Sequence, residues 1–206
     1  MIISHQHRFI FVAVPKTGTH SVREALRPHL GPDDEEQARL FVEKKLSNPA
    51  LAAVGHGHIS LAHLQPLMER GAFEQYVKFA FVRNPFDRFV SYCAFITRKT
   101  GAFERDPQSV MRGFVSAPPM SHIIFRPQHQ LLVDGTGALL TDMVGKVEQM
   151  QEDFDAICKR IGIPTTQLGH KNSSHHEDYR TYYDQQLIDG VAQIFARDLE
   201  LFGYDF

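Results

Sequence analysis

The chain has 206 residues, enough for one domain with a sizeable core, and its hydrophobic content of 43% and charged content of 22% are ordinary for globular proteins. A formal net charge of −2 excludes a general nucleic-acid binder with a broad basic surface, and no apolar run is long enough to span a bilayer. Residues 1–8 show no signal-peptide pattern, and two cysteines, Cys93 and Cys158, are too few for a disulfide framework. We therefore expect one cytoplasmic domain, residues 1–206, with both thiols free.

The first part of the chain alternates apolar runs with polar turns and helical patterns. Residues 9–14 are a continuous apolar run, typical of a buried strand, and a polar turn at residues 15–19 leads into a predicted helix at 21–30. Residues 33–46 are an acidic, helix-prone stretch, and residues 54–60 are rich in glycine and histidine. A helical pattern follows at residues 61–69.

The rest of the chain continues this alternation. A second buried strand is predicted at residues 77–82, with a helix after it as far as Thr97, and a third strand at 143–147. Residues 101–119 are expected to be a mobile insertion. Turns with short apolar runs follow at residues 123–142, and an amphipathic helix is predicted at 150–161. A polar loop is expected at 170–179 and a long final helix at 184–202. Strands that alternate with helices predict an α/β fold with a central, mostly parallel sheet flanked by helices.

The polar turn after the first strand has the composition of an anion-binding loop. A glycine-containing turn between a strand and a helix exposes main-chain N–H groups, which bind anions together with the helix dipole. Gly18 lets the main chain approach a ligand closely, Lys16 supplies a positive charge, and hydroxyl donors come from Thr17, Thr19 and Ser21. The segment does not fit the Walker A pattern. A plain turn with a solvated lysine is the alternative.

A second cation follows the second strand. Arg83 stands where open α/β sheets bind ligands, and Ser91 lies two turns into the next helix, from which its hydroxyl could share a phosphate with Arg83. The alternative is that Arg83 pairs with Asp87 and that Ser91 is a small packing residue. Two such strand ends in one small domain favour a nucleotide that carries two separated phosphates.

Both elements resemble motifs of sulfotransferases that use 3′-phosphoadenylyl sulfate (PAPS). Residues 15–19, Pro-Lys-Thr-Gly-Thr, are similar to their 5′-phosphosulfate loop, and residues 83–92 are similar to their 3′-phosphate element. The chain departs from the family at His20, where a hydroxyl or a small residue is usual. Further matches, to the group that contains Golgi carbohydrate sulfotransferases (sulfotransferase family 2) and its short bacterial relatives, lie at residues 126–128, 145–148, 153–154, 172–173 and 201–206.

The resemblance implies a P-loop-like three-layer fold and the transfer of a sulfuryl group from PAPS to a hydroxyl of an acceptor, expected to be a carbohydrate. The product would be 3′,5′-ADP, and no metal, nucleic acid or transmembrane segment is expected. The residues expected to bind the donor are Pro15, Lys16, Thr17, Gly18, Thr19, His20, Ser21, Arg83, Ser91, Lys171, Asn172 and Ser173.

Sulfuryl transfer also needs a base for the proton of the acceptor hydroxyl, and a histidine suits that role near neutral pH. The segment from His56 to His58, His-Gly-His, resembles one in uronyl 2-O-sulfotransferases in which the second histidine is implicated as the base. By that resemblance His58 is the base, with a pKa near ~6.5, and His56 supports it or binds the acceptor. Lys16 stabilises the charge that grows on the leaving 5′-phosphate.

Other interpretations of the same residues stay open. His56 and His58 could be a metal pair, although no carboxylate lies close by in the sequence, or they could be purely structural. The chain could also be a nucleotide kinase-like phosphotransferase, although its second strand ends in Arg83 rather than in an aspartate that holds Mg²⁺. A non-catalytic nucleotide-binding module would keep Lys16 and Arg83 but need no base.

Overall fold

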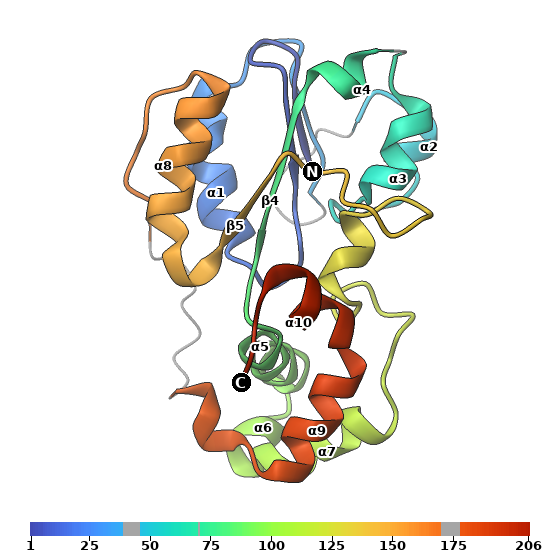
Figure 1. The fold of residues 1–206 in the computed structure, drawn as a ribbon, viewed down its shortest axis with the longest axis vertical. Helices are drawn as coiled ribbons and strands as arrows, with labels where there is room; N and C mark the ends of the chain where they lie inside the picture. Colours follow the sequence, from blue (N-terminus) through green and yellow to red (C-terminus); the bar gives the residue numbers. More distant parts are fainter. Residues whose placement is uncertain (39–45, 70, 170–177) are drawn as a thin grey trace. The chain divides into compact units, whose positions relative to one another are not determined.

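The computed structural model describes residues 1–38, 46–69, 71–169 and 178–206 (Figure 1). The chain divides into two compact units, Met1–Val82 with Gln130–Lys171, and Arg83–His129 with Asn172–Phe206. The first holds the β-sheet and is called the sheet unit below. The second consists of helices and is called the helical unit.

The sheet of the described residues has five strands in the order β3-β1-β2-β4-β5. Its inner strands include β2 (Phe9–Val12) and β4 (Val77–Val82), which confirms the two predicted buried strands. These two strands are parallel, and β5 (Met143–Lys146), the predicted third strand, is parallel to β4. Every residue of β2 is buried, as expected for a strand covered on both faces.

The other two strands make the sheet mixed rather than mostly parallel. β1 (Ile2–Ser4) is antiparallel to β2, and β3 (Glu35–Glu36) is antiparallel to β1. The link from β1 to β2 has only four residues, 5–8, so the two strands can pair only as a hairpin, because a parallel pair needs a long crossover. Strands of two or three residues are too short to show an apolar period in the sequence, and neither was predicted.

Glu36 explains why the described part of the acidic, helix-prone stretch at residues 33–46 is not helical. Its carboxylate, in β3, accepts hydrogen bonds from Arg23 at 2.8 Å and from Arg27 at 3.0 Å. This buried ion pair holds the segment against α1 (Thr19–Leu26). Residues 39–45 lie outside the described part.

Helices cover both faces of this sheet. α1 and α8 (Met150–Ile161) lie on one face, and α2 (Pro49–Ala52), α3 (Leu61–Leu64) and α4 (Ala72–Gln75) lie on the other (Figure 1). α8 has the predicted bounds, whereas α1 begins two residues early and gives way to a 3-10 turn at Pro28. The shorter elements of the unit are η1 (Arg27–His29), α2 (Pro49–Ala52), α3 (Leu61–Leu64), η2 (Gln65–Leu67), α4 (Ala72–Gln75) and η4 (Val147–Gln149).

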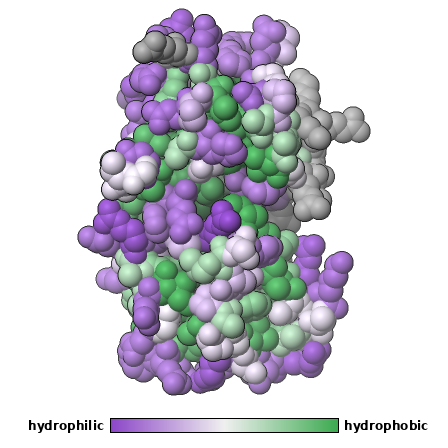
Figure 2. All heavy atoms as spheres, turned by 90° about the vertical axis from the view of Figure 1, so that its right-hand side faces the viewer, coloured by the Kyte–Doolittle hydropathy of each residue, from purple (hydrophilic) through white to green (hydrophobic). Residues whose placement is uncertain are grey.

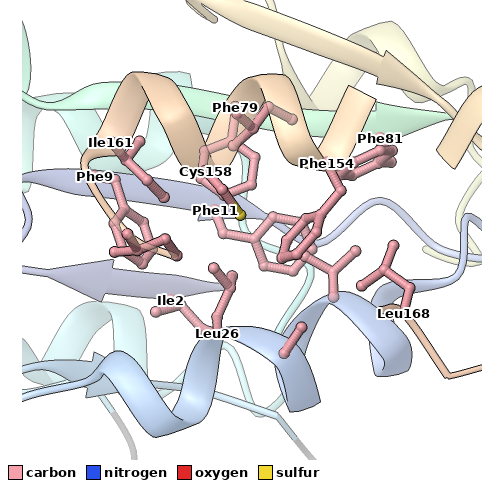
Figure 3. Packing of buried hydrophobic residues seen from close by; sticks show 14 of the residues in the cluster. Ile2, Phe9, Phe11, Leu26, Phe79, Phe81, Phe154, Cys158, Ile161 and Leu168 are labelled. Atoms are coloured by element: carbon pink, nitrogen blue, oxygen red, sulfur yellow. The ribbon is translucent and has the colours of Figure 1, made fainter. Parts of the chain in front are cut away.

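The core of the sheet unit lies between the sheet, α1 and α8 (Figure 3). The rings of Phe11 and Phe79, on neighbouring parallel strands, stack with their centroids 5.3 Å apart. Leu26 of α1 and Phe154 of α8 pack against them and are fully buried. Burying side chains of this size stabilises the fold by about 1.5–3 kcal/mol each.

Gly145 allows β5 and α8 to approach closely. A Cβ atom at this position would lie 2.5 Å from the ring of Phe81 and 3.1 Å from the Cβ of Asp153. The carboxylate of Asp153 accepts a hydrogen bond of 2.6 Å from the main-chain N–H of Lys146. The motif matches at residues 145–148 and 153–154 therefore coincide with the joint between this strand and this helix.

The helical unit encloses a second, largely aromatic core. Its centre is α5 (Pro85–Thr97), which ends at Thr97 as predicted. Asn84 caps it by accepting a hydrogen bond of 3.0 Å from the N–H of Phe86. The other elements are α6 (Ala102–Arg105), α7 (Pro107–Ser116), η3 (Gln128–Leu131, shared with the sheet unit), η5 (Tyr179–Tyr182), α9 (Gln185–Ile194) and α10 (Ala196–Phe202).

Residues 101–119 are not the mobile insertion that the sequence suggested. They form α6 and α7, whose residues Phe103 and Met111 are buried in the aromatic core. Asp106 separates the two helices and caps α7 by accepting from the N–H of Ser109 at 3.0 Å. Because α6 is only four residues long, the apolar residues of this stretch show no continuous helical period in the sequence.

The final helix is interrupted at Phe195. This residue has φ −109° and ψ 22° and separates α9 from α10. Its ring is buried, with its centroid 5.5 Å from that of Phe125. Leu187 and Val191 are buried in the same core, so the predicted apolar face is correct although the helix is not continuous.

Hydrophilic and hydrophobic residues are interspersed on the face shown in Figure 2. Among the described residues, no helix has both the length and the apolar character needed to cross a membrane. Cys93 and Cys158 are free and buried, which confirms that neither forms a disulfide.

Candidate active site

The turn after β2 is shaped by two residues in the left-handed backbone region. Lys16 has φ +68° and Gly18 has φ +69°. A Cβ atom at Gly18 would lie 2.6 Å from the Cε of Met150, but the flexible end of that side chain can move, so glycine is needed here mainly for its conformation. A lysine in this region costs about 1–2 kcal/mol. Strain of this kind is concentrated at functional sites, which is consistent with a ligand-binding role for the turn.

Two of the expected donor hydroxyls hold this turn in place. Thr17 is fully buried, and its hydroxyl donates to the main-chain oxygen of Val14 at 2.9 Å. The hydroxyl of Ser21 donates to the main-chain oxygen of Gly169 at 2.6 Å. In this arrangement both protons are directed at main-chain carbonyls, so the two hydroxyls can accept a further hydrogen bond but not donate one. Thr19 begins α1 and is half-buried.

His20 is half-buried in the first turn of α1. Burial lowers its pKa, and the nearby charge of Arg23 lowers it further. The imidazole is therefore neutral at neutral pH. It adds no positive charge to the turn, although a neutral ring still has one N–H to donate.

The segment from His56 to His58 packs against buried polar atoms of Gln37 and Arg23. A Cβ atom at Gly57 would lie 2.1 Å from the main-chain oxygen of Gln37 and 2.7 Å from Nη2 of Arg23. The side-chain amide of Gln37 donates to the main-chain oxygen of His56 at 3.0 Å. The middle residue of His-Gly-His must therefore be glycine for the segment to lie at this depth.

His58 contacts the main chain between β2 and the Lys16 turn. Its Nδ1 lies 2.6 Å from the main-chain oxygen of Ala13, two residues before Pro15. A carbonyl oxygen can only accept, so Nδ1 carries the proton and the lone pair of the ring is on Nε2. The main-chain N–H of His58 donates to Nδ1 of His56 at 3.3 Å, and the two ring centroids are 5.9 Å apart. The structure thus brings both histidines and the base of the turn together.

The environment of His58 lowers its pKa to about 4, mainly because the ring is buried. The hydrogen bond to Ala13 opposes this shift, whereas repulsion from the N-terminal amine and from His56 when these are protonated, and from Arg23, lowers the pKa further. The expectation of an unshifted imidazole was therefore wrong. At neutral pH the ring is uncharged and in the tautomer that a general base requires, although it is a weaker base than a free histidine.

Arg83 and Ser91 belong to the helical unit. Nε of Arg83 donates to the carboxylate of Asp87 at 2.7 Å, so the ion pair considered above as an alternative is present. Ser91 is buried and lies one helical turn beyond Asp87, on the same side of α5. Arg83 itself is only partly buried.

Two glutamines that sequence reasoning gave no role hold functional segments in place. Gln37 binds the main chain beside the histidines, and Gln128 pairs with the main chain of Arg83 at 3.0 and 2.9 Å. Gln128 stands in the motif match at residues 126–128, which was the one available signal. Gln37 lies in a stretch that reads as a surface helix, so nothing in the sequence indicated its burial.

Lys171, Asn172 and Ser173 lie outside the described residues, and so do His175 and His176 of the polar loop. Within the described residues, no group of three or more histidine, cysteine, aspartate or glutamate side chains could hold a metal ion.

A comparison with protein families covers almost the whole chain. A sequence model described as "Sulfotransferase family" matches residues 1–205. No curated protein and no solved structure shows significant similarity to the chain. Because the family match omits only the last of 206 residues, the chain belongs to the sulfotransferase family.

Proposed function

We propose that this sulfotransferase transfers a sulfuryl group from PAPS to a hydroxyl of a carbohydrate acceptor, without a metal ion. Membership of the family supports sulfuryl transfer in general. The choice of donor and acceptor rests on the motif resemblances at residues 15–19, 83–92 and 56–58. A P-loop-like arrangement and a cytoplasmic location are parts of the same proposal, and they too rest on the sequence.

The observation that carries the proposal is the placement of His58. Its ring is neutral, its Nδ1 proton is held by Ala13, and its Nε2 has a lone pair. A histidine that is hydrogen-bonded to the residue between β2 and the proposed anion-binding turn supports a site at which an acceptor hydroxyl and an anionic donor would meet beside a base. A nucleotide-binding module without catalysis has no need of that placement.

In the proposed sulfuryl transfer, one bond to sulfur forms as another breaks. The acceptor oxygen attacks the sulfur atom of PAPS while its proton passes to Nε2 of His58. The bond between sulfur and the bridging oxygen breaks, and its electron pair stays on the 5′-phosphate of the product, 3′,5′-ADP. Lys16 stabilises the negative charge that grows there. His56, beside the base, supports it or contacts the acceptor.

The remaining donor contacts are assigned by resemblance. In this assignment, the turn from Pro15 to Ser21, His20 included, binds the 5′-phosphosulfate. The 3′-phosphate is assigned to Arg83 and Ser91, and the adjoining nucleotide to Lys171, Asn172 and Ser173. The hydroxyls of Thr17 and Ser21 would act as hydrogen-bond acceptors, or would have to exchange their present partners.

One assay tests this function directly. The protein is incubated with PAPS and a panel of hydroxyl acceptors that includes sugars, and the 3′,5′-ADP that forms is measured with and without a chelator. We expect acceptor-dependent 3′,5′-ADP that the chelator does not reduce. Binding of 3′,5′-ADP without turnover on any acceptor would favour a non-catalytic module, and phosphate transfer from ATP would favour a kinase-like enzyme.

A further inference from the structure

Gln128 holds both main-chain polar groups of Arg83. Its Oε1 accepts from the N–H of Arg83 at 3.0 Å, and its Nε2 donates to the carbonyl of Arg83 at 2.9 Å. Gln128 is fully buried. A side-chain amide that pairs with both groups of one residue imitates the pairing that a neighbouring strand would provide. One side chain therefore sets the orientation of the peptide groups on either side of Arg83.

The position of Gln128 is itself fixed by a buried carboxylate. Its main-chain N–H donates to Oδ2 of Asp198 at 2.7 Å, and Asp198 is fully buried. The other oxygen, Oδ1, accepts from the main-chain N–H of His129 at 2.9 Å and lies 2.7 Å from Nδ1 of the same residue. Gln128 thus belongs to a network that leaves it little freedom to move.

A buried arginine shapes the segment that carries Gln128. Nη2 of Arg88 donates to the main-chain oxygens of Ile124 and Arg126 at 2.9 and 2.6 Å. Burial lowers the pKa of Arg88 to about 10, and the charge of Asp198 opposes this shift. Arg88 lies in α5, the helix that begins two residues after Arg83. The network therefore connects the start of this helix to Gln128 and, through Gln128, to Arg83.

We propose that Gln128 is a positioning residue that gives the enzyme its selectivity for a 3′-phosphorylated nucleotide, acting through Arg83. This inference rests on the proposed function, in which Arg83 binds the 3′-phosphate. Asp87 orients the guanidinium of Arg83, and Gln128 orients the main chain from which that side chain extends. Loss of the amide would leave two polar main-chain groups without partners, and the segment would turn to satisfy them. A small displacement is enough to weaken a charge-assisted contact.

The first test is Gln128→Met, which keeps the length of the side chain but removes both hydrogen bonds. Affinities for 3′,5′-ADP and 5′-AMP are measured by calorimetry on the full chain. We expect 3′,5′-ADP to bind roughly tenfold more weakly, equivalent to about 1.4 kcal/mol, while the affinity for 5′-AMP changes by less than about twofold. A loss of affinity that is equal for both nucleotides would indicate a merely structural role and overturn the inference.

Gln37→Met is the matched control. Gln37 is also buried, and its amide also binds main-chain groups, at Leu46, Leu51 and His56. The two variants lose the same kind of contact, so their thermal stabilities can be compared. Only Gln128→Met should change the preference for 3′,5′-ADP over 5′-AMP. A similar change in both variants would contradict the inference.

Gln128→Glu gives a second readout if Gln128→Met does not fold. A protonated carboxyl group can accept from the N–H of Arg83 and donate to its carbonyl, whereas a carboxylate can only accept. Relative to the wild type, the preference of Gln128→Glu for 3′,5′-ADP should therefore increase as the pH falls from 8 to 5.5. A preference that stays parallel to that of the wild type over this range would count against the positioning role.

Arg83→Ala separates this inference from the function on which it rests. If the wild type does not prefer 3′,5′-ADP to 5′-AMP, or if Arg83→Ala keeps that preference, the assignment of the 3′-phosphate to Arg83 fails. If Arg83→Ala loses the preference and folded Gln128→Met keeps it, the proposed function stands and the positioning role of Gln128 is wrong.

Discussion

Nδ1 of His58 lies 2.6 Å from the main-chain oxygen of Ala13, which directly follows β2 and leads into the Lys16 turn. This one hydrogen bond sets the tautomer of the ring and attaches the candidate base to the candidate donor-binding turn. It also limits how far the ring can rotate. The proposed base is therefore held in place by a contact between its side chain and the main chain. A substitution that keeps this contact but removes the base tests the catalytic role by itself.

His58→Asn removes the base but keeps a side-chain N–H that can donate to Ala13. We expect kcat on the best acceptor to fall about 10²–10⁴-fold, the usual contribution of a positioned base, while 3′,5′-ADP affinity stays nearly unchanged. His58→Ala should lose the same activity and also loosen the segment. Steady-state kinetics and calorimetry measure both effects. The exposed His63 offers a control, since His63→Ala should leave kcat unchanged. Near-full turnover of His58→Asn would rule out His58 as the base.

The pH dependence of kcat/KM should reflect the lowered pKa of His58. Because this pKa is about 4, the ring is already neutral well below pH 6. The acid side of the profile should therefore be flat between about pH 5 and 7 and fall only as the pH approaches 4. A profile with a midpoint near 6.5 would show that a different group, or a His58 exposed to water, is the base.

The lowered pKa of His58 also predicts how the stability of the protein depends on pH. In the unfolded chain His58 titrates near ~6.5, whereas in the folded chain its pKa is about 4. Between these values the unfolded state binds the proton and the folded state does not, so the free energy of unfolding falls as the pH is lowered through this window. His58→Asn removes this contribution, so its Tm should decline less between pH 7 and 4.5 than that of the wild type. Parallel declines would contradict the shift.

Lys16 provides a test of strain at a functional residue. Lys16→Ala and Lys16→Gly both remove the ammonium group and should both lower kcat and donor affinity. Only glycine adopts φ +68° without strain, so Lys16→Gly should be more stable than Lys16→Ala by about 1–2 kcal/mol. Thermal unfolding measures the difference. Equal stability of the two variants would mean that the left-handed conformation of Lys16 is not strained.

Gly57→Ala tests whether close packing at Gly57 sets the position of the two histidines. The new methyl group would overlap the main-chain oxygen of Gln37, so the segment must move outward and carry His58 away from Ala13. We expect a loss of about 1–3 kcal/mol in the free energy of unfolding, together with reduced kcat. Gly113→Ala is the control, because a Cβ atom there meets nothing within 4 Å and α7 should gain slightly in stability. Wild-type kcat in Gly57→Ala would show that the position of His58 is not critical.

Arg83→Ala should weaken 3′,5′-ADP much more than 5′-AMP, because only the former carries the 3′-phosphate. A charge-assisted hydrogen bond contributes about 1.5–3 kcal/mol. The variant also removes the ion pair between Arg83 and Asp87, so Arg83→Ala with Asp87→Asn is measured alongside. The preference should be lost in both variants. If the double variant keeps it, the effect of Arg83→Ala comes from the charge of Asp87 and not from a lost contact with the 3′-phosphate.

Much of the sheet unit could be predicted from local sequence. The strands β2 and β4, the turn with Lys16 and Gly18, and helix α8 each follow from patterns that span fewer than fifteen neighbouring residues. Apolar runs and turn residues act over such distances because they report the period and the conformation of the chain itself. The same is true of the two motifs by which the sulfotransferase family was identified.

The contacts that give the candidate site its chemistry were decided only by the tertiary structure. Ala13 and His58 are 45 residues apart in the chain, and so are Arg83 and Gln128. Both contacts join a side chain to a main-chain group, which no residue pattern records. The sequence determined that Arg83 directly follows the second predicted strand and that the chain contains a His-Gly-His segment. The tertiary structure decided the tautomer and the lowered pKa of His58, since both depend on burial and on a carbonyl that only the folded chain brings within reach.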